Sequence, residues 1–208
     1  MSDVIIGRKA EQEILRQRID SKSPELIAIY GRRRIGKTYL VRQYFNDSFS
    51  FYATGIYQGT KNEQLGEFNR QLEYYSGRKW NVAKDWFDAF AQLREYLDSI
   101  DGDSPIIVFL DELPWMDTHK SNFVRSLDHF WNGWATTRRD IVLIICGSAT
   151  SWIIDNVIMN YGGLHNRLTN QIFVEPFCLR ECKQYCEWKG LGYTDNQVLE
   201  AYMALGGI

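Results

Sequence analysis

Short apolar segments alternate with longer amphipathic segments along most of this chain. The apolar or aromatic segments occupy residues 26–30, 49–53, 106–110, 141–146 and 172–174. Because they lack the apolar–polar alternation of half-exposed strands, they predict strands that are buried on both faces. Apolar residues recur at helical spacing within residues 8–20, 37–45, 64–75, 86–97, 122–134, 180–188 and 197–205. The alternation predicts an α/β fold, a five-stranded parallel sheet with flanking helices on both faces.

The composition is that of an ordinary globular protein with a sizeable core. The chain has 208 residues, of which 45% are hydrophobic and 24% are charged, and this length indicates one domain and a fraction of a second. It contains no apolar run long enough to span a membrane and no apolar signal segment near its start. Its four cysteines are too few for a disulfide scaffold. We therefore expect a cytoplasmic protein with reduced thiols and no membrane partner.

Charge is distributed unevenly, although the net charge is only −2. Residues 1–45 hold ten Lys and Arg against five Asp and Glu, whereas residues 81–128 hold four against ten. The basic part suits an anion, and the acidic part suits a metal ion or the activation of water. The small net charge excludes a general basic field for nucleic acid.

The segment 31–38, Gly-Arg-Arg-Arg-Ile-Gly-Lys-Thr, fits the phosphate-loop pattern of the Walker A motif at each fixed position. It follows a predicted strand and opens a predicted helix, which is the context that the motif requires. Gly31 and Gly36 permit a loop whose amides turn toward an anion, and the helix N-terminus adds partial positive charge. Lys37 would reach the β- and γ-phosphates, and the Thr38 hydroxyl would bind Mg²⁺. The alternative is an ordinary glycine-rich turn before a helix.

A pair of carboxylates, Asp111 and Glu112, directly follows the apolar segment 106–110. This arrangement is typical of a Walker B motif. Asp111, at the carboxyl end of its strand, would hold Mg²⁺. Glu112 would orient or deprotonate the attacking water. An acidic turn after a strand is the alternative, but its occurrence together with the phosphate loop favours a P-loop nucleoside triphosphatase.

Several short motifs together resemble those of the AAA+-related archaeal-type ATPases, which occur in archaea and bacteria and lie close to the signal-transducing STAND NTPases. The resemblance rests on the loop 31–38, the segments 111–115 and 146–148, the Gly-Arg box at 6–11 and the ending 204–208. It spans nearly the whole chain. It implies a three-layer P-loop NTPase core of AAA+ type at residues 1–177 and the first helices of a C-terminal lid at residues 178–208.

The resemblance also implies roles for individual residues. Ser148 would be the sensor-1 group near the γ-phosphate, although a serine that caps the next helix is the alternative. Arg167 would act as an arginine finger on the nucleotide of a neighbouring subunit in a homo-oligomer, although a mobile surface arginine is an equal alternative. The residues expected to contact ATP or ADP are Ile6, Gly7, Arg8, Gly31, Arg34, Ile35, Gly36, Lys37, Thr38 and Tyr39, with the Gly-Arg box beside the adenine.

Two functions use these same residues. One is Mg²⁺-dependent ATP hydrolysis that energises or switches an effector domain outside this chain. The other is a slow nucleotide switch that binds ATP or ADP and controls a partner with negligible turnover. Family members usually continue through a full lid and a winged helix, so we expect this sequence to be the ATPase portion of a longer protein. Any DNA contact would then come from the further C-terminal domains.

Two further groups of residues were weighed as sites. Cys178, Cys182 and Cys186 follow one another at helical spacing, but zinc prefers four ligands and C-x₂-C turns, so we favour a stripe of small buried residues. Trp131 and Trp134 share the helical phase of apolar neighbours and are expected in the core. Trp115, just after the acidic pair, is the tryptophan that we single out as a candidate for an exposed, functional position.

Overall fold

The computed structural model describes residues 5–102, 104–159, 164 and 166–208. Five parallel strands form one sheet in the order β2-β3-β4-β1-β5. The strands are β1 (Glu25–Tyr30), β2 (Phe51–Thr54), β3 (Ile106–Asp111), β4 (Ile141–Gly147) and β5 (Asn170–Phe173). The predicted α/β fold with a five-stranded parallel sheet is therefore confirmed.

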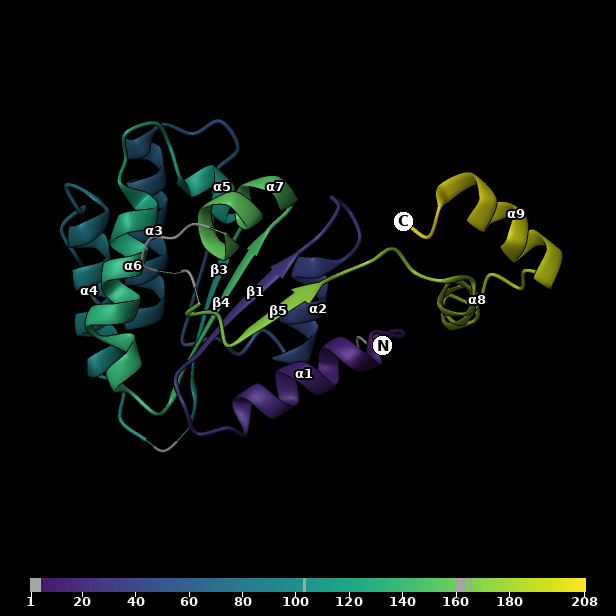
Figure 1. The fold of residues 1–208 in the computed structure, drawn as a ribbon, viewed down its shortest axis with the longest axis horizontal. Coiled ribbons are helices and arrows are strands. Elements are labelled where there is room, and N and C mark those ends of the chain that lie inside the picture. The colour runs from purple at the N-terminus through teal and green to yellow at the C-terminus, as the bar shows by residue number, and fades with distance from the viewer. Residues whose placement is uncertain (1–4, 103, 160–163, 165) are drawn as a thin grey trace.

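Helices cover both faces of this sheet (Figure 1). One face carries α1 (Lys9–Ile19) and α2 (Lys37–Tyr44), and the other carries α3 (Lys61–Ser76), α4 (Trp86–Asp98) and α6 (Phe123–Gly133). The shorter helices are α5 (Leu113–Met116), the 3₁₀ turn η1 (Ala135–Thr137), α7 (Thr150–Ile153) and the π-helical η2 (Ile154–Ile158). A helix after Ser148 was expected, but the apolar pattern predicted no residue range for α5, η1, α7 or η2, because each is too short to show helical periodicity.

The central strands are apolar throughout because they contribute to two separate cores. In β1, Leu26 and Ala28 pack with the α3, α4 and α6 side, whereas Ile27 and Ile29 pack with α1 and α2. Every residue of β4 is buried. Since no polar side chain can be accommodated along these strands, polar chemistry is restricted to the ends where the chain leaves the sheet.

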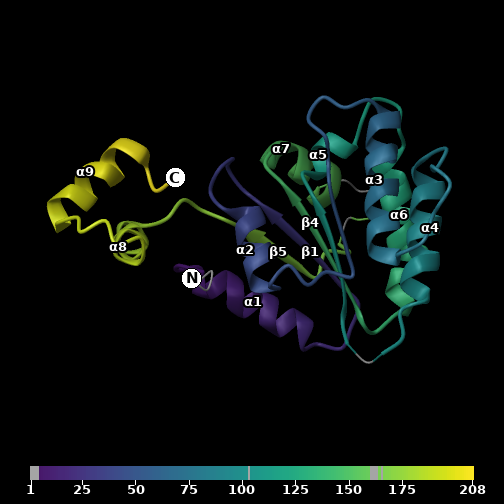
Figure 2. The ribbon, with the colours of Figure 1, turned by 180° about the vertical axis from the view of Figure 1, so that it is seen from behind.

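The last two helices lie apart from the three layers, beyond the β5 side of the sheet (Figures 1 and 2). They are α8 (Leu179–Trp188) and α9 (Asp195–Leu205), which pack mainly on each other. Both helices are fully described, and of their residues only Val198 is buried. Within the described part of the chain, no helix combines the length and the apolar character that a membrane span requires.

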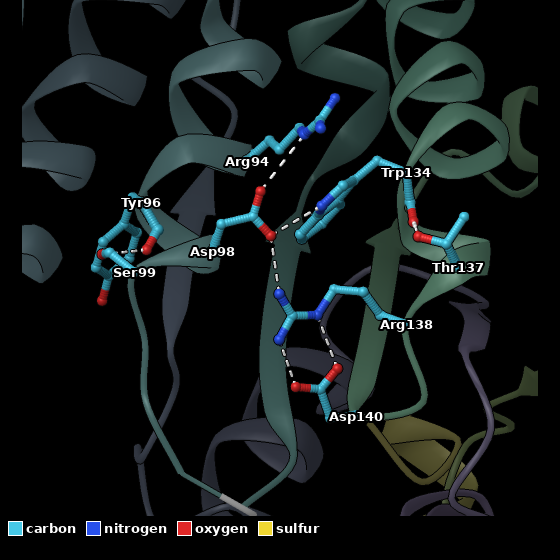
Figure 3. Close-up of polar contacts among 8 residues, drawn as sticks. All are labelled: Arg94, Tyr96, Asp98, Ser99, Trp134, Thr137, Arg138 and Asp140. Carbon is cyan, nitrogen blue, oxygen red and sulfur yellow. Dashed lines mark hydrogen bonds and ion pairs between the residues drawn. The ribbon is translucent and has the colours of Figure 1, made fainter.

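A polar network ties the helical layer to the end of the sheet opposite the phosphate loop (Figure 3). Asp98, at the end of α4, accepts hydrogen bonds from Trp134 Nε1 at 3.0 Å and from Arg138 at 2.9 Å. Arg138 also forms a two-pronged pair with Asp140, at 2.8 and 2.6 Å, just before β4 begins. The side chain of Arg138 is only 21% exposed, so this network fixes α4, α6 and β4 relative to one another.

Replacing Arg138 by Met is expected to lower the free energy of unfolding by about 1–2 kcal/mol at neutral pH, because charged hydrogen bonds to Asp98 and Asp140 are lost. The Arg138 hydrogen bonds lower the folded-state pKa of Asp140. The stabilisation from this pair is therefore fully present above the unfolded-state pKa, about 3.9, and is lost as the pH falls through the lower folded-state pKa.

Urea unfolding followed by circular dichroism, at neutral pH and at several values below about pH 4, measures this difference. The neighbouring exposed residue provides a matched control, Arg139→Met, for which no comparable loss is expected. A stability difference between parent and Arg138→Met that does not shrink in acid would contradict the interpretation.

Candidate functional site

The phosphate loop joins the end of β1 to the start of α2. Gly36 precedes α2 with a φ of 87°, a left-handed conformation that favours glycine. Ile35 is buried in the core between the sheet and α2, and this contact anchors the loop. Lys37 is only 5% exposed, and its Nζ donates to the carbonyl oxygens of Gly31 at 3.0 Å and Arg32 at 2.8 Å. The ammonium group therefore lies inside the curve of the loop.

Thr38 and Asp111 meet across the carboxyl edge of the sheet. The Thr38 hydroxyl donates to Asp111 Oδ2 at 2.7 Å, although 73 positions separate them in the sequence. Asp111 ends β3 and is only 3% exposed, and its Oδ1 accepts from the Glu112 amide at 2.9 Å. A hydroxyl beside a buried carboxylate is a hard-oxygen donor pair, the kind that binds Mg²⁺ together with nucleotide phosphates. The residues present therefore fit a Mg²⁺ ion.

Cys146 on β4 belongs to the same buried environment. Burial raises the pKa of its thiol well above the usual value, and the nearby Asp111 carboxylate raises it further, while Lys37 acts in the opposite direction. The thiol therefore stays protonated and neutral. It therefore adds no further charge beside Asp111 and Lys37.

Glu112 has a different side-chain partner from Asp111, and its backbone is left-handed, with φ 45° and ψ 47°, at the start of α5. This is an uncommon conformation for a residue other than glycine. Its Oε2 accepts from the Ser148 hydroxyl at 2.9 Å and from the Ser148 amide at 3.2 Å. The residue preceding α7 is Ala149, and no side-chain cap was found there. The capping alternative for Ser148 is therefore wrong, because its hydroxyl is used to hold Glu112.

Arg167 lies apart from this group, on the exposed segment before β5. The described residues show no hydrogen bond or ion pair between Arg167 and the phosphate loop. Its charge acts instead on Asp128 of α6, whose pKa is raised by burial and lowered in part by Arg167. The chain therefore does not bring Arg167 to its own phosphate loop.

A cavity of about 620 Å³ opens beside the phosphate loop, between the N-terminal segment, α2 and the helices α8 and α9. Its size is within the range of small-molecule sites. Six of the predicted nucleotide contacts line it: Ile6, Arg8, Arg34, Ile35, Gly36 and Tyr39. Gly31, Lys37 and Thr38 belong to the adjoining loop and helix start, and Gly7 packs against Glu181 instead.

Sequence reasoning missed the far wall of the cavity, which is built by Phe177, Tyr185, Trp188 and Tyr202. The sequence feature that could have indicated this wall is the pair of helical segments 180–188 and 197–205. They carry aromatic residues but follow the last predicted strand, so no further strand is available to bury those residues. The prediction that Cys178, Cys182 and Cys186 form a stripe of small buried residues is wrong. Cys178 is exposed, and Cys182 and Cys186 are half-buried, because α8 faces the cavity rather than a packed core.

Arg8 connects the N-terminal segment, the phosphate loop and the chain leading into α8. Its side chain donates to the Ile35 carbonyl at 3.2 Å, and its guanidinium lies 4.6 Å from the ring centroid of Phe177. Its backbone amide donates to Glu181 Oε1 on α8 at 3.2 Å. The Phe177 amide in turn donates to the Gly207 carbonyl at 2.9 Å, so the end of the described chain folds back on the same point.

Glu181 is the acceptor that holds α8 to the N-terminal segment. Its second oxygen accepts from the Cys178 amide at 2.9 Å. Burial would raise the pKa of Glu181, but the hydrogen bonds from the Cys178 and Arg8 amides outweigh it and leave the pKa lowered. The carboxylate therefore stays ionised and available to both amides.

Replacing Glu181 by Ala is expected to make the Arg8 and Cys178 amides exchange hydrogen about 5- to 10-fold faster, because each loses an acceptor worth about 1 kcal/mol. Hydrogen exchange with mass spectrometry on peptides around residues 5–9 and 177–182 measures this. Glu187→Ala, an exposed position on the same helix, is the matched control and is expected to leave both peptides unchanged. Equal exchange in parent and Glu181→Ala would exclude this role.

Comparison with known proteins identifies the family. Residues 6–208 match a family described as an ATPase domain predominantly from Archaea. An uncharacterized protein of Methanocaldococcus jannaschii is 26% identical over 186 residues, which cover 88% of this chain and 38% of that protein. The present chain thus spans well under half of that relative.

Solved structures show the same fold at low sequence identity. The Walker-type ATPase of Pyrococcus abyssi superposes with a TM-score of 0.68 at 20% identity, covering 98% of this chain and 64% of that one. A STAND protein with a tetratricopeptide repeat sensor from Pyrococcus horikoshii gives 0.56 at 21% identity, covering 99% and 28%. Together with the family match, these findings show that the chain belongs to the family of ATPase domains found predominantly in Archaea and has the fold of a P-loop ATPase.

Proposed function

We propose that this chain binds ATP in the cavity beside the phosphate loop and hydrolyses it with Mg²⁺, in order to energise or switch an effector elsewhere in a longer protein. The observation that carries the proposal is the convergence of Lys37, Thr38, Asp111 and Glu112 at one edge of the sheet. A phosphate-binding cation, a hydroxyl–carboxylate pair and a second carboxylate are the groups that phosphoryl transfer to water requires.

Nucleotide phosphates would be bound by the loop amides and by Lys37. The ammonium group already lies inside the loop, held by two carbonyl oxygens, so it needs only a small movement to exchange these acceptors for phosphate oxygens. The base and ribose would occupy the cavity against Arg8, Tyr39 and the aromatic wall of α8 and α9. Mg²⁺, held by Thr38 and Asp111, would neutralise phosphate charge.

Glu112 would position and deprotonate the attacking water, and Ser148 would govern when it can do so. In this structure Ser148 donates two hydrogen bonds to one oxygen of Glu112. Both hydrogen bonds occupy the same oxygen, so Oε2 is not free to accept from a water molecule. Release of Glu112 from Ser148 would therefore accompany the reactive state, and Ser148 would then be free to contact the γ-phosphate.

Glu112→Gln is expected to keep ATP binding and to lower turnover by about 10²- to 10⁴-fold, because an amide cannot accept the proton from water. Calorimetry measures whether ATP binding is kept, and phosphate release in the presence of Mg²⁺ measures whether turnover is lowered. Glu200→Gln, on the exposed face of α9, is the matched control. Hydrolysis by Glu112→Gln at the parent rate would mean that another group is the base.

We further propose that Arg167 completes the site of a neighbouring copy of the chain. Its exposed position supports a role between copies, as does the lack of any hydrogen bond or ion pair between Arg167 and the phosphate loop among the described residues. The turnover per molecule should then rise with protein concentration, and Arg167→Ala should remove the rise, with a loss on the order of 10³-fold at saturation.

Measurement of turnover and of solution mass over the same concentration range tests this role, with Arg139→Ala as a control for loss of a surface arginine. A turnover per molecule that does not change with concentration, from a protein that stays monomeric, would contradict it.

A nucleotide switch with very slow turnover is the second candidate function. Two observations favour it: Ser148 restrains Glu112, and Arg8 and Glu181 couple the phosphate loop to α8. The similarity to a signal-transduction ATPase of the STAND class also supports it. ADP that stays bound through purification, combined with negligible turnover at high protein concentration, would favour the switch over the steady hydrolase.

A further inference from the structure

Three segments meet next to Glu112, on the outside of the proposed ATP site. They are the phosphate loop, the loop that follows β2, and α5 at the carboxyl edge of the sheet (Figure 1). Trp115 on α5 lies between the other two. The Arg33 guanidinium lies 5.6 Å from its ring centroid, and the Tyr57 ring lies 5.3 Å away at a steep angle of 64°. We refer to Arg33, Tyr57 and Trp115 as the aromatic–arginine cluster.

The loop that carries Tyr57 is held rigidly. Gly55 lies so close to α5 that an added Cβ would be 2.6 Å from the Glu112 carbonyl oxygen and 2.9 Å from Trp115 Cβ. The amide side chain of Gln64, buried at the start of α3, accepts from the Ile56 amide at 2.9 Å and donates to the Ile56 carbonyl at 2.7 Å. These contacts restrict the loop, so Tyr57 is presented from a fixed support.

Tyr57 is nevertheless 61% exposed. Its neighbouring backbone is restrained and its ring contacts Trp115, yet most of the side chain remains open to solvent. Such rings are suited to stack on an incoming planar group, because little entropy remains to be lost on binding. The geometry thus points to a ligand with flat, unpaired aromatic groups.

The charge beside the cluster identifies the rest of that ligand. Arg32, Arg33 and Arg34 are all exposed, and among the described residues no carboxylate forms an ion pair with them. The acidic residues that flank α5 have other partners: Glu112 accepts a hydrogen bond from Ser148, and Asp117 accepts one from Trp152. Guanidinium groups bind phosphates in a fork geometry, so the surface suits an anion that carries phosphates at short intervals.

We propose that the aromatic–arginine cluster, with Arg32, is a docking surface for a short single-stranded nucleic acid segment, with Tyr57 stacked on a base and the arginines on its phosphates. A duplex would not fit this description, because its bases are already stacked on each other. The surface belongs to this chain and differs from the DNA contacts expected of further C-terminal domains. It adjoins the proposed ATP site, because Arg32 and Arg33 belong to the phosphate loop, but Tyr57 and Trp115 lie on other segments, so the surface can be tested without nucleotide.

Fluorescence anisotropy of the whole 208-residue chain, without nucleotide and at low salt, tests the proposal. The probes are labelled thymidine and uridine oligomers of about twelve nucleotides and a duplex of the same length. We expect both single strands to bind, and the difference between them tells whether DNA or RNA fits better. With two arginines on phosphates, log K should fall with log salt with a slope of about −1.4. A duplex that binds as tightly as the single strands would overturn the proposal.

Variants separate stacking from charge. Tyr57→Ala should weaken binding about 5- to 150-fold, the range of one base–aromatic stack, and Tyr57→Phe should retain it. Tyr74→Ala, on α3 and 77% exposed, is the matched control and should bind as the parent does. Arg33→Ala should weaken binding and make the salt slope less steep by about 0.7. Circular dichroism confirms that each variant is folded.

Two further results would refute the docking surface. One is the absence of binding to either single strand at low salt by folded parent protein. The other is binding that Tyr57→Ala leaves unchanged. If a labelled poly-glutamate peptide also binds as tightly as the single strands, the site recognises negative charge alone. Neither result depends on ATP hydrolysis, so failure here and failure of the proposed ATPase function can be distinguished.

Discussion

Burial of the central strands on both faces is the constraint on which the rest of this structure depends. Because β1, β3 and β4 have helices on each side, their side chains must be apolar, and all polar chemistry moves to the strand ends. The strand order then decides which ends meet. Because β4 lies between β1 and β3, the loops that follow these three strands lie close together. Thr38, after β1, donates a hydrogen bond to Asp111 at the end of β3, and Ser148, after β4, donates one to Glu112.

The sequence predicted this part of the molecule well, for a physical reason. An apolar run directly before a motif places that motif at the carboxyl edge of the sheet. Lys37, Thr38, Asp111 and Glu112 could therefore be assigned to one region from the two motifs and the strands that precede them. The five parallel strands and their helices were also predicted within a few residues of their bounds. What the sequence did not show was contact detail, for example that the hydroxyl of Ser148 holds Glu112 rather than caps the next helix.

The side of the cavity that α8 and α9 form was much less predictable. Contacts such as that between Arg8 and Phe177, or between Glu181 and two backbone amides, depend on where the chain turns after β5. A turn of this kind is fixed by tertiary packing and leaves no periodic signal in the sequence. The cysteine pattern misled for the same reason, because helical spacing shows that three residues share a face but does not show what that face meets.

The short length of α5 has a thermodynamic consequence. The helix contains only four residues, with Glu112 immediately before it and Trp115 within it, so one rigid turn carries both the proposed base and the centre of the aromatic–arginine cluster. If nucleotide favours a different orientation of this turn, Trp115 moves with the turn and its contact with Tyr57 changes. Suppose that a ligand on Tyr57 prefers one orientation of the turn. Because linkage is reciprocal, that ligand changes the affinity for nucleotide by some factor, and nucleotide changes the affinity for the ligand by the same factor.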